Sequence, residues 1–169
     1  MSVDTQRVFS EVMASIFAAF DHSGTGKVDA GELASGFTVL CSGKKSDKLE
    51  HGFEVLDNNK KGQLPRSEVK VYIRSFLTVL LSVACSKHLE SDTDEQGMSF
   101  VDGSPCSQDL PELGKAAEAG SEWAASQALA SVTAKTMNFD DFAEWYTKKG
   151  YSSIPWLELL DLRKWVLNG

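Results

Sequence analysis

Apolar residues recur at helical spacing along much of the chain, and short polar turns interrupt them. Over residues 3–20 the apolar positions fall on one helix face, namely Phe9, Val12, Met13, Ile16, Phe17 and Phe20. Similar patterns follow over residues 30–41, 46–56 and 66–88. Polar, glycine-containing turns interrupt these patterns after Phe20 and after Leu56. The pattern therefore predicts a helix–turn–helix unit that occurs twice.

The middle of the chain departs from this pattern. Residues 89–122 are rich in Asp and Glu, hold Lys115 as their single base, and contain Pro105 and Pro111. Such a composition cannot bury much apolar surface, so residues 90–120 are predicted to form an acidic flexible insert. Helix is expected to resume between Pro111 and Leu129.

Two more helices are expected near the C-terminus. Asn138 is a favourable N-cap for the first, and Pro155 is a favourable first-turn residue for the second, expected to reach Leu167. The second is apolar around more than half its circumference, so it must be buried, either in the core or in a groove that a partner can fill. No strand-rich region appears, and the predicted fold class is all-α.

The first polar turn has the chemistry of a calcium loop. Ca2+ takes six to eight oxygen ligands, and a 12-residue loop supplies them from positions 1, 3, 5, 7, 9 and 12, with Gly at position 6. In residues 21–32 the ligand positions hold Asp21, Ser23, Thr25, Lys27 (through its carbonyl), Asp29 and Glu32. Gly26 is sixth, and the apolar Val28 is eighth, where it is expected to pair with a neighbouring loop. The turn resembles an EF-hand. The alternative is an acidic turn that binds no metal.

The second polar turn, residues 57–68, keeps the same frame with two substitutions. The candidate ligands are Asp57, Asn59, Gln63 and Glu68, and Gly62 and Leu64 stand sixth and eighth. Lys61 occupies the fifth position, where a cation repels the metal, and Pro65 replaces the oxygen-bearing side chain at the ninth. One Ca2+ site is therefore expected in the first turn, and the second turn is expected to brace it.

A third copy is predicted around Met137 and Asp141, which would be its eighth and twelfth positions. Its remaining key positions hold Ala130, Val132, Ala134 and Lys135, none of which can serve as a ligand or as the required glycine. Residues 92–97 also place acids before a glycine, but they are interpreted as linker. The expected organisation is an EF-hand pair at 1–89, the insert at 90–120, and a degenerate third EF-hand plus C-terminal helix at 121–169.

The resemblance extends beyond the loops. Residues 33–64 resemble the region between two central EF-hands in neuronal calcium sensor, calcineurin B-like and calmodulin-like proteins. The matching features are Val39-Leu40, Gly43, Lys48-Leu49, Phe53 and the Asp57 loop. The resemblance covers residues 9–88 well and 121–149 faintly. It implies that the three loops correspond to the family's second, third and fourth hands.

Charge and composition argue against several classes of protein. The net charge of −7 argues against nucleic acid binding, which needs a basic face. Three cysteines do not make a disulfide framework, and the longest apolar stretch, Phe76–Cys85, is far below the about 20 residues of a membrane span. Ser2 stands where N-myristoylation needs glycine, so no stable membrane anchor is expected. A cytoplasmic protein is expected.

The function expected from these features is that of a Ca2+ sensor. Binding at the first turn would expose a groove for an amphipathic helix of a target protein or of the same longer chain. The alternatives are an EF-hand scaffold or adaptor with little Ca2+ switching, and a Ca2+ buffer. No catalytic constellation appears, so no enzyme activity is expected. The last alternative is a thiol enzyme that uses Cys85 and His88, which are one helical turn apart.

Overall fold

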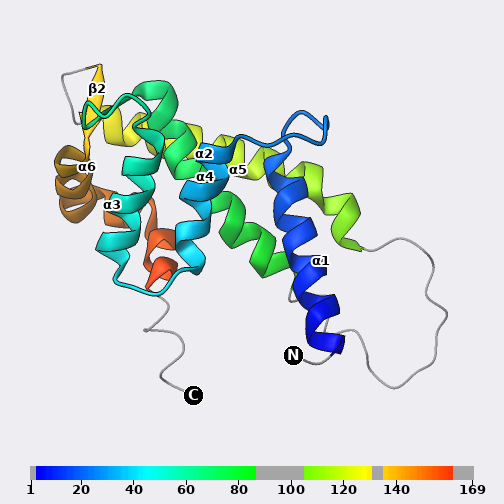
Figure 1. Ribbon diagram of the computed structural model, residues 1–169. Helices are drawn as coiled ribbons and strands as arrows, with labels where there is room; N and C mark the ends of the chain where they lie inside the picture. The colour runs from blue at the N-terminus through cyan, green and yellow to red at the C-terminus, as the bar shows by residue number, and fades with distance from the viewer. Residues whose placement is uncertain (1–2, 87–104, 131–134, 162–169) are drawn as a thin grey trace.

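The computed structural model describes residues 3–86, 105–130 and 135–161, which are almost entirely helical (Figure 1). The first helices are α1 (Val3–Phe20), α2 (Ala30–Phe37), the 3-10 turn η1 (Thr38–Leu40) and α3 (Lys45–Leu56). They are followed by β1 (Gln63–Pro65), α4 (Arg66–Ser86), α5 (Pro105–Ala130) and β2 (Thr136–Asn138). The last elements are α6 (Phe139–Trp145), the π-helical turn η3 (Tyr146–Gly150), α7 (Tyr151–Ser153) and the 3-10 segment η4 (Pro155–Leu160). The all-α prediction is confirmed, and none of the described helices is long and apolar enough to cross a membrane.

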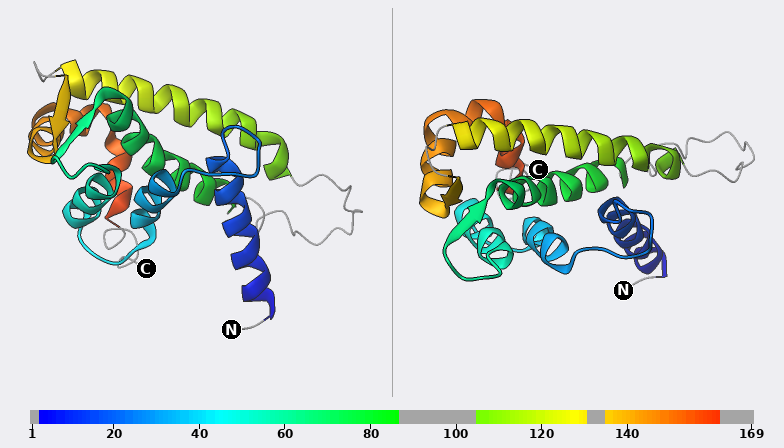
Figure 2. Two further views of the ribbon diagram at one scale, coloured as in Figure 1. Left: turned by 45° about the horizontal axis from the view of Figure 1, so that its top comes forward. Right: turned by 90° about the horizontal axis from the view of Figure 1, so that it is seen from above.

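Helix α4 is the centre of the fold. The helices α1, α2, α3 and α5 all contact it, and α5 runs alongside it and reaches over α1 (Figure 2). The fully buried Tyr72 of α4 makes edge-to-face ring contacts with Phe53, Phe76 and Phe142. Its hydroxyl donates a 2.9 Å hydrogen bond to the Leu49 carbonyl, which satisfies the phenol within the core. Burial raises the pKa of Tyr72 well above its ordinary value.

Helix α2 lies close to α4 because Gly36 has no side chain. A Cβ atom at this position would lie 2.7 Å from the carbonyl oxygen of Ser75 and 2.8 Å from the Phe20 ring. Real Cβ atoms do not approach a backbone oxygen so closely, so any larger residue would push α2 away from α4. The close approach at Gly36 therefore keeps α2, the helix that follows the first polar turn, against the central helix.

The short sheet joins two segments that are far apart in the sequence. Strands β1 and β2 are antiparallel, and Leu64 pairs with Met137; both side chains are fully buried. Leu64 is the eighth residue of the second polar turn, and Met137 is the predicted eighth residue of the third copy. Val28, the eighth residue of the first turn, lies in no strand. The second turn therefore pairs with the third copy, whereas the sequence led us to expect a pair between the first two turns.

Helix α5 differs from the predicted flexible insert. Residues 105–120 are helical, and the helix continues to Ala130; residues 90–104 lie outside the described part of the chain. A stripe of small buried residues faces the core, consisting of Ala117, Ser121, Ala124, Ala125 and Ala128. Small side chains permit close helix packing but give little hydrophobic contrast in the sequence. That is why the acids and prolines dominated the prediction.

The C-terminal segment is part of the core. Ile154, Leu157 and Leu160 are fully buried, which favours the core-packing alternative for this segment. The predicted helix from Pro155 begins as expected, but residues 155–160 form a 3-10 segment, and residues 162–169 lie outside the described part. The buried Lys48 of α3 donates hydrogen bonds to the carbonyls of Val39 (2.9 Å) and Leu160 (3.1 Å). Burial lowers the pKa of this lysine.

Candidate metal loop and its charged network

The side chain of Asp21 organises the first polar turn. Its Oδ2 accepts a 2.6 Å hydrogen bond from the Gly26 N–H, and its Oδ1 accepts from the Thr25 N–H and the Ser23 hydroxyl, both at 3.1 Å. The hydroxyl oxygens of Ser23 and Thr25 are 2.7 Å apart. These bonds, led by the one from Gly26, lower the pKa of Asp21. Three predicted ligand side chains, at positions one, three and five, thus gather at one point.

The second polar turn repeats this conformation. Asp57 Oδ2 accepts a 2.6 Å hydrogen bond from the Gly62 N–H, and its Oδ1 accepts a 3.1 Å bond from the Lys61 N–H. The sixth residues, Gly26 and Gly62, have φ of 73° and 68°, and the fourth residues, Gly24 and Lys60, have φ of 65° and 54°. Left-handed backbone at the same two positions of both turns indicates one loop geometry used twice.

The other predicted ligands of the second turn are spread over several elements. Asn59 accepts a 3.2 Å hydrogen bond from the Lys61 N–H. Gln63 lies in β1, where its side-chain carbonyl accepts a 2.9 Å hydrogen bond from the Thr136 hydroxyl of β2. Glu68 lies in the first turn of α4.

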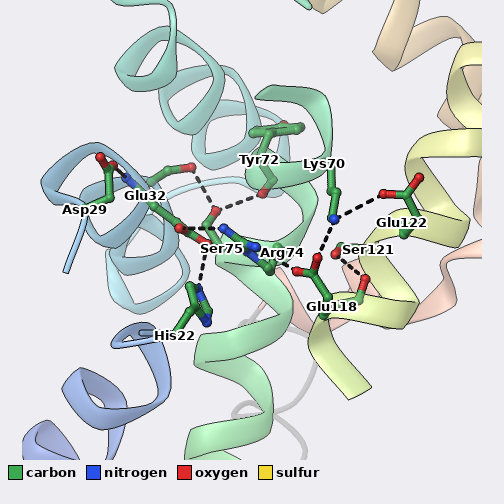
Figure 3. Close-up of polar contacts among 11 residues, drawn as sticks. His22, Asp29, Glu32, Lys70, Tyr72, Arg74, Ser75, Glu118, Ser121 and Glu122 are labelled. Atoms are coloured by element: carbon green, nitrogen blue, oxygen red, sulfur yellow. Dashed lines mark hydrogen bonds and ion pairs between the residues drawn. The ribbon is translucent and has the colours of Figure 1, made fainter. Parts of the chain in front are cut away.

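Asp29 and Glu32, the last two ligands predicted in the first turn, occupy the start of α2. Asp29 is the N-cap of this helix, and its Oδ1 accepts a 2.8 Å hydrogen bond from the Glu32 N–H. The Glu32 side chain is 5% exposed and is bound by Arg74 of α4 (Figure 3). Arg74 Nε donates to Glu32 Oε1 at 2.7 Å and Nη2 donates to Oε2 at 2.9 Å, while His22 Nε2 lies 3.3 Å from Oε1. Arg74 therefore binds both carboxylate oxygens of Glu32.

Arg74 also connects Glu32 to α5. Its Nη1 donates to Glu118 Oε2 at 2.7 Å, and Lys70, one turn earlier on α4, pairs with Glu118 and lies 3.2 Å from Glu122 (Figure 3). Burial opposes the charge of Arg74, but its bonds to Glu32 and Glu118 outweigh that and raise its pKa. Hydrogen bonds from Lys70 and Arg74 lower the pKa of Glu118.

This network was missed in the sequence. The sequence places Glu118 and the acids before it in a predicted flexible insert, yet Glu118 and Glu122 face a row of bases on α4. The sequence signal that could have revealed this network is the four-residue spacing of the bases on α4 and of the acids on α5. Arg66, Lys70 and Arg74 lie on one face of α4, and Glu118 and Glu122 lie on one face of α5.

The oxygen atoms of the first turn are of the type that a hard cation takes as ligands. Their present positions, however, do not form a complete ligand set. Asp21, Ser23, Thr25, Asp29 and the Lys27 carbonyl supply oxygen ligands of the type that Ca2+ takes. Among the described residues, however, no three His, Cys, Asp or Glu side chains are grouped to hold a metal ion. The missing element is Glu32, which would have to turn from Arg74 to the loop.

The structure describes only part of the third copy and of the pair of Cys85 and His88. Asn138 and Asp141 form a reciprocal capping box at the start of α6, which confirms the N-cap prediction. Ala130 ends α5 and Lys135 is exposed. Val132, Ala134, His88 and residues 92–97 lie outside the described part of the chain, and Cys85 lies in α4.

A cavity of about 380 Å³ was not anticipated from the sequence. It lies between α3, α6 and the C-terminal segment and is lined by Lys45, Ser46, Leu49, Phe139, Phe142, Ala143, Tyr146, Thr147, Tyr151 and Glu158. Glu158 accepts a 2.7 Å hydrogen bond from the Tyr146 hydroxyl and pairs with Lys45 at its edge.

Comparisons with known proteins give limited information. No protein-family model matches the chain, and no solved structure matches it. A guanylyl cyclase inhibitory protein of Lithobates pipiens is 31% identical over 78 residues. The matched region covers 46% of this chain and 38% of that protein, so the chain spans well under half of its relative's length.

Proposed function

We propose that this chain is a Ca2+-binding regulatory protein of the EF-hand type, with its principal site in residues 21–32. The observation that carries the proposal is the geometry around Asp21, where a carboxylate and two hydroxyls meet above a left-handed glycine. Asp57 accepts the equivalent hydrogen bond from the left-handed Gly62, which supports an EF-hand repeat. Two unrelated acidic turns have no reason to share left-handed residues at the fourth and sixth positions and the same bond from the sixth residue to the first.

The regulatory part of the proposal is that binding alters a contact with a partner helix. The first turn ends in α2, which packs on α4, so a change at the loop reaches the central helix directly. The partner would be an amphipathic helix of a target protein or of a longer polypeptide. The relative is named as an inhibitor of guanylyl cyclase, which is consistent with an action on another protein. Its own target is not carried over to this chain.

The second turn is proposed to have a structural role. Lys61 places a positive charge at a ligand position, and β1 fastens the turn to β2. One Ca2+ per chain is therefore expected.

A calcium titration followed by NMR tests the proposal. Added Ca2+ should shift the amide resonance of Gly26 and leave that of Gly62 nearly unchanged. Glu32→Gln should weaken Ca2+ binding at least tenfold, about 1.4 kcal/mol, because it removes a charge and a two-oxygen ligand. The matched control is Glu68→Gln, at the same position of the second turn, and it should bind Ca2+ as the natural chain does.

The scaffold alternative is favoured by one observation, the engagement of Glu32 with Arg74. A scaffold would give no heat in calorimetry with Ca2+ and no shift at Gly26. A buffer would bind Ca2+ but would not expose apolar surface to a dye. These two results would each replace the sensor proposal with a different function.

A further inference from the structure

The pair of Glu32 and Arg74 links the first turn to the two central helices. The side chain of Glu32 is 5% exposed and that of Arg74 is 16% exposed, so the pair is largely shielded from water. Two hydrogen bonds of 2.7 and 2.9 Å bind both carboxylate oxygens to the guanidinium group. Charge-assisted pairs with this fork geometry are among the stronger polar contacts in proteins.

A cation in the first turn needs the same two oxygens. The twelfth residue of such a loop is a bidentate ligand, and Glu32 holds that position. A carboxylate whose two oxygens accept from an arginine fork cannot present both to a cation at the Asp21 end of the loop. Arginine and cation therefore compete for Glu32.

Arg74 has a second carboxylate partner that remains when Glu32 leaves. A largely buried arginine left without a partner would be costly, but Nη1 of Arg74 already donates to Glu118 at 2.7 Å. The bond to α5 keeps the guanidinium paired when Glu32 turns away. Glu32 can thus move from Arg74 to the cation without leaving an isolated charge. The change in the pairing of Arg74 then acts on the contact between α4 and α5.

We propose that Arg74 is a positioning residue for Glu32 that sets the cation affinity of the first turn and passes its occupancy to α5 through Glu118. This inference rests on the proposed function and adds a competitor that the 12-residue motif does not contain. It also accounts for the absence of a grouped ligand set among the described residues.

The test compares two neighbouring variants of the full chain by Ca2+ calorimetry. Arg74→Gln removes the competitor and should tighten Ca2+ binding about tenfold, as expected for one charge-assisted contact. Lys70→Gln is the matched control, because Lys70 shares the partner Glu118 and lies on the same face of α4 but has no contact with Glu32. Its affinity should stay within about twofold of the natural chain.

The possible results separate the inference from the proposed function. Tighter binding in Arg74→Gln alone supports both. Equal affinity in all three proteins overturns the inference and leaves the function standing. Binding in Arg74→Gln but not in the natural chain supports the inference and overturns the sensor function. No binding in any of them overturns both, because the released loop should then be competent.

A measurement on the natural chain covers the case in which Arg74→Gln does not fold. The Nε–H resonance of Arg74 should shift during a Ca2+ titration, in step with the Gly26 amide, since Glu32 leaves that donor. A Gly26 amide that titrates while the Arg74 Nε–H resonance stays in place would overturn the inference.

Discussion

Leu64 and Met137 face each other across the two-stranded sheet, and neither side chain is exposed. This pair joins the second polar turn to the start of α6, although the two residues are 73 positions apart in the sequence (137 − 64 = 73). Leu64→Ala should lower the free energy of unfolding by about 2–4 kcal/mol, because it leaves a cavity at the junction. Val28 holds the same position in the first turn and its side chain is only half-buried, so Val28→Ala should cost less than about 1 kcal/mol. Urea denaturation measures both values, and equal losses would contradict the asymmetry between the two turns.

Two substitutions should give the second turn the ligand oxygens that it lacks. Lys61→Asp together with Pro65→Asp places oxygens at the fifth and ninth positions of a loop whose backbone already has the required shape. Calorimetry should then show two Ca2+ per chain in place of one. The control replaces Lys61→Asp with Lys60→Asp, which makes the same charge change at a non-ligand position whose φ of 54° aspartate tolerates. A stoichiometry that remains at one in the folded repaired chain would show that charge is not what limits this loop.

Two adjacent leucines distinguish core from surface in the C-terminal segment. Leu160 is fully buried, and its carbonyl accepts a hydrogen bond from Lys48, whereas Leu159 is 39% exposed. Leu160→Ala should destabilise the chain by about 2–5 kcal/mol, and Leu159→Ala by less than about 1 kcal/mol. Thermal unfolding followed by circular dichroism compares them. A small effect of Leu160→Ala would mean that this segment is not part of the core.

The bonds of Glu118 to α4 predict a dependence of stability on pH. Lys70 and Arg74 lower its pKa below the ordinary 4.5, so its contribution is present above that value and is lost as the pH falls through the lowered pKa. Because the Glu118 side chain is 48% exposed, solvent screening limits this contribution to about 1 kcal/mol or less. The stability difference between the natural chain and Glu118→Gln should therefore shrink as the solution is made more acidic than about pH 4.5.

The control for this prediction lies on the same helix. Glu112 pairs with Lys115 within α5, and both side chains are highly exposed, so Glu112→Gln should change stability little at any pH. A gap between the natural chain and Glu118→Gln that is independent of pH would show that the substitution acts through packing.

Local features of this protein follow directly from the sequence. The glycines at the sixth positions, the aspartates that begin both turns and the Asn138 N-cap act within a few residues of themselves. Their conformations are fixed by short-range hydrogen bonds and by which residues tolerate left-handed backbone, so the motif predicts them. Helical periodicity likewise located the helices that bury large side chains.

Contacts between distant segments were decided only in the tertiary structure. Nothing near Glu32 indicates that Arg74 will bind it, and nothing near Leu64 indicates that Met137 will be its partner. The small residues of α5 that are buried in the core contribute little to a hydropathy pattern, although their size lets helices pack closely. A charged or apolar side chain specifies the kind of partner it needs, while the packing of helices that are far apart in the chain determines which residue meets that need.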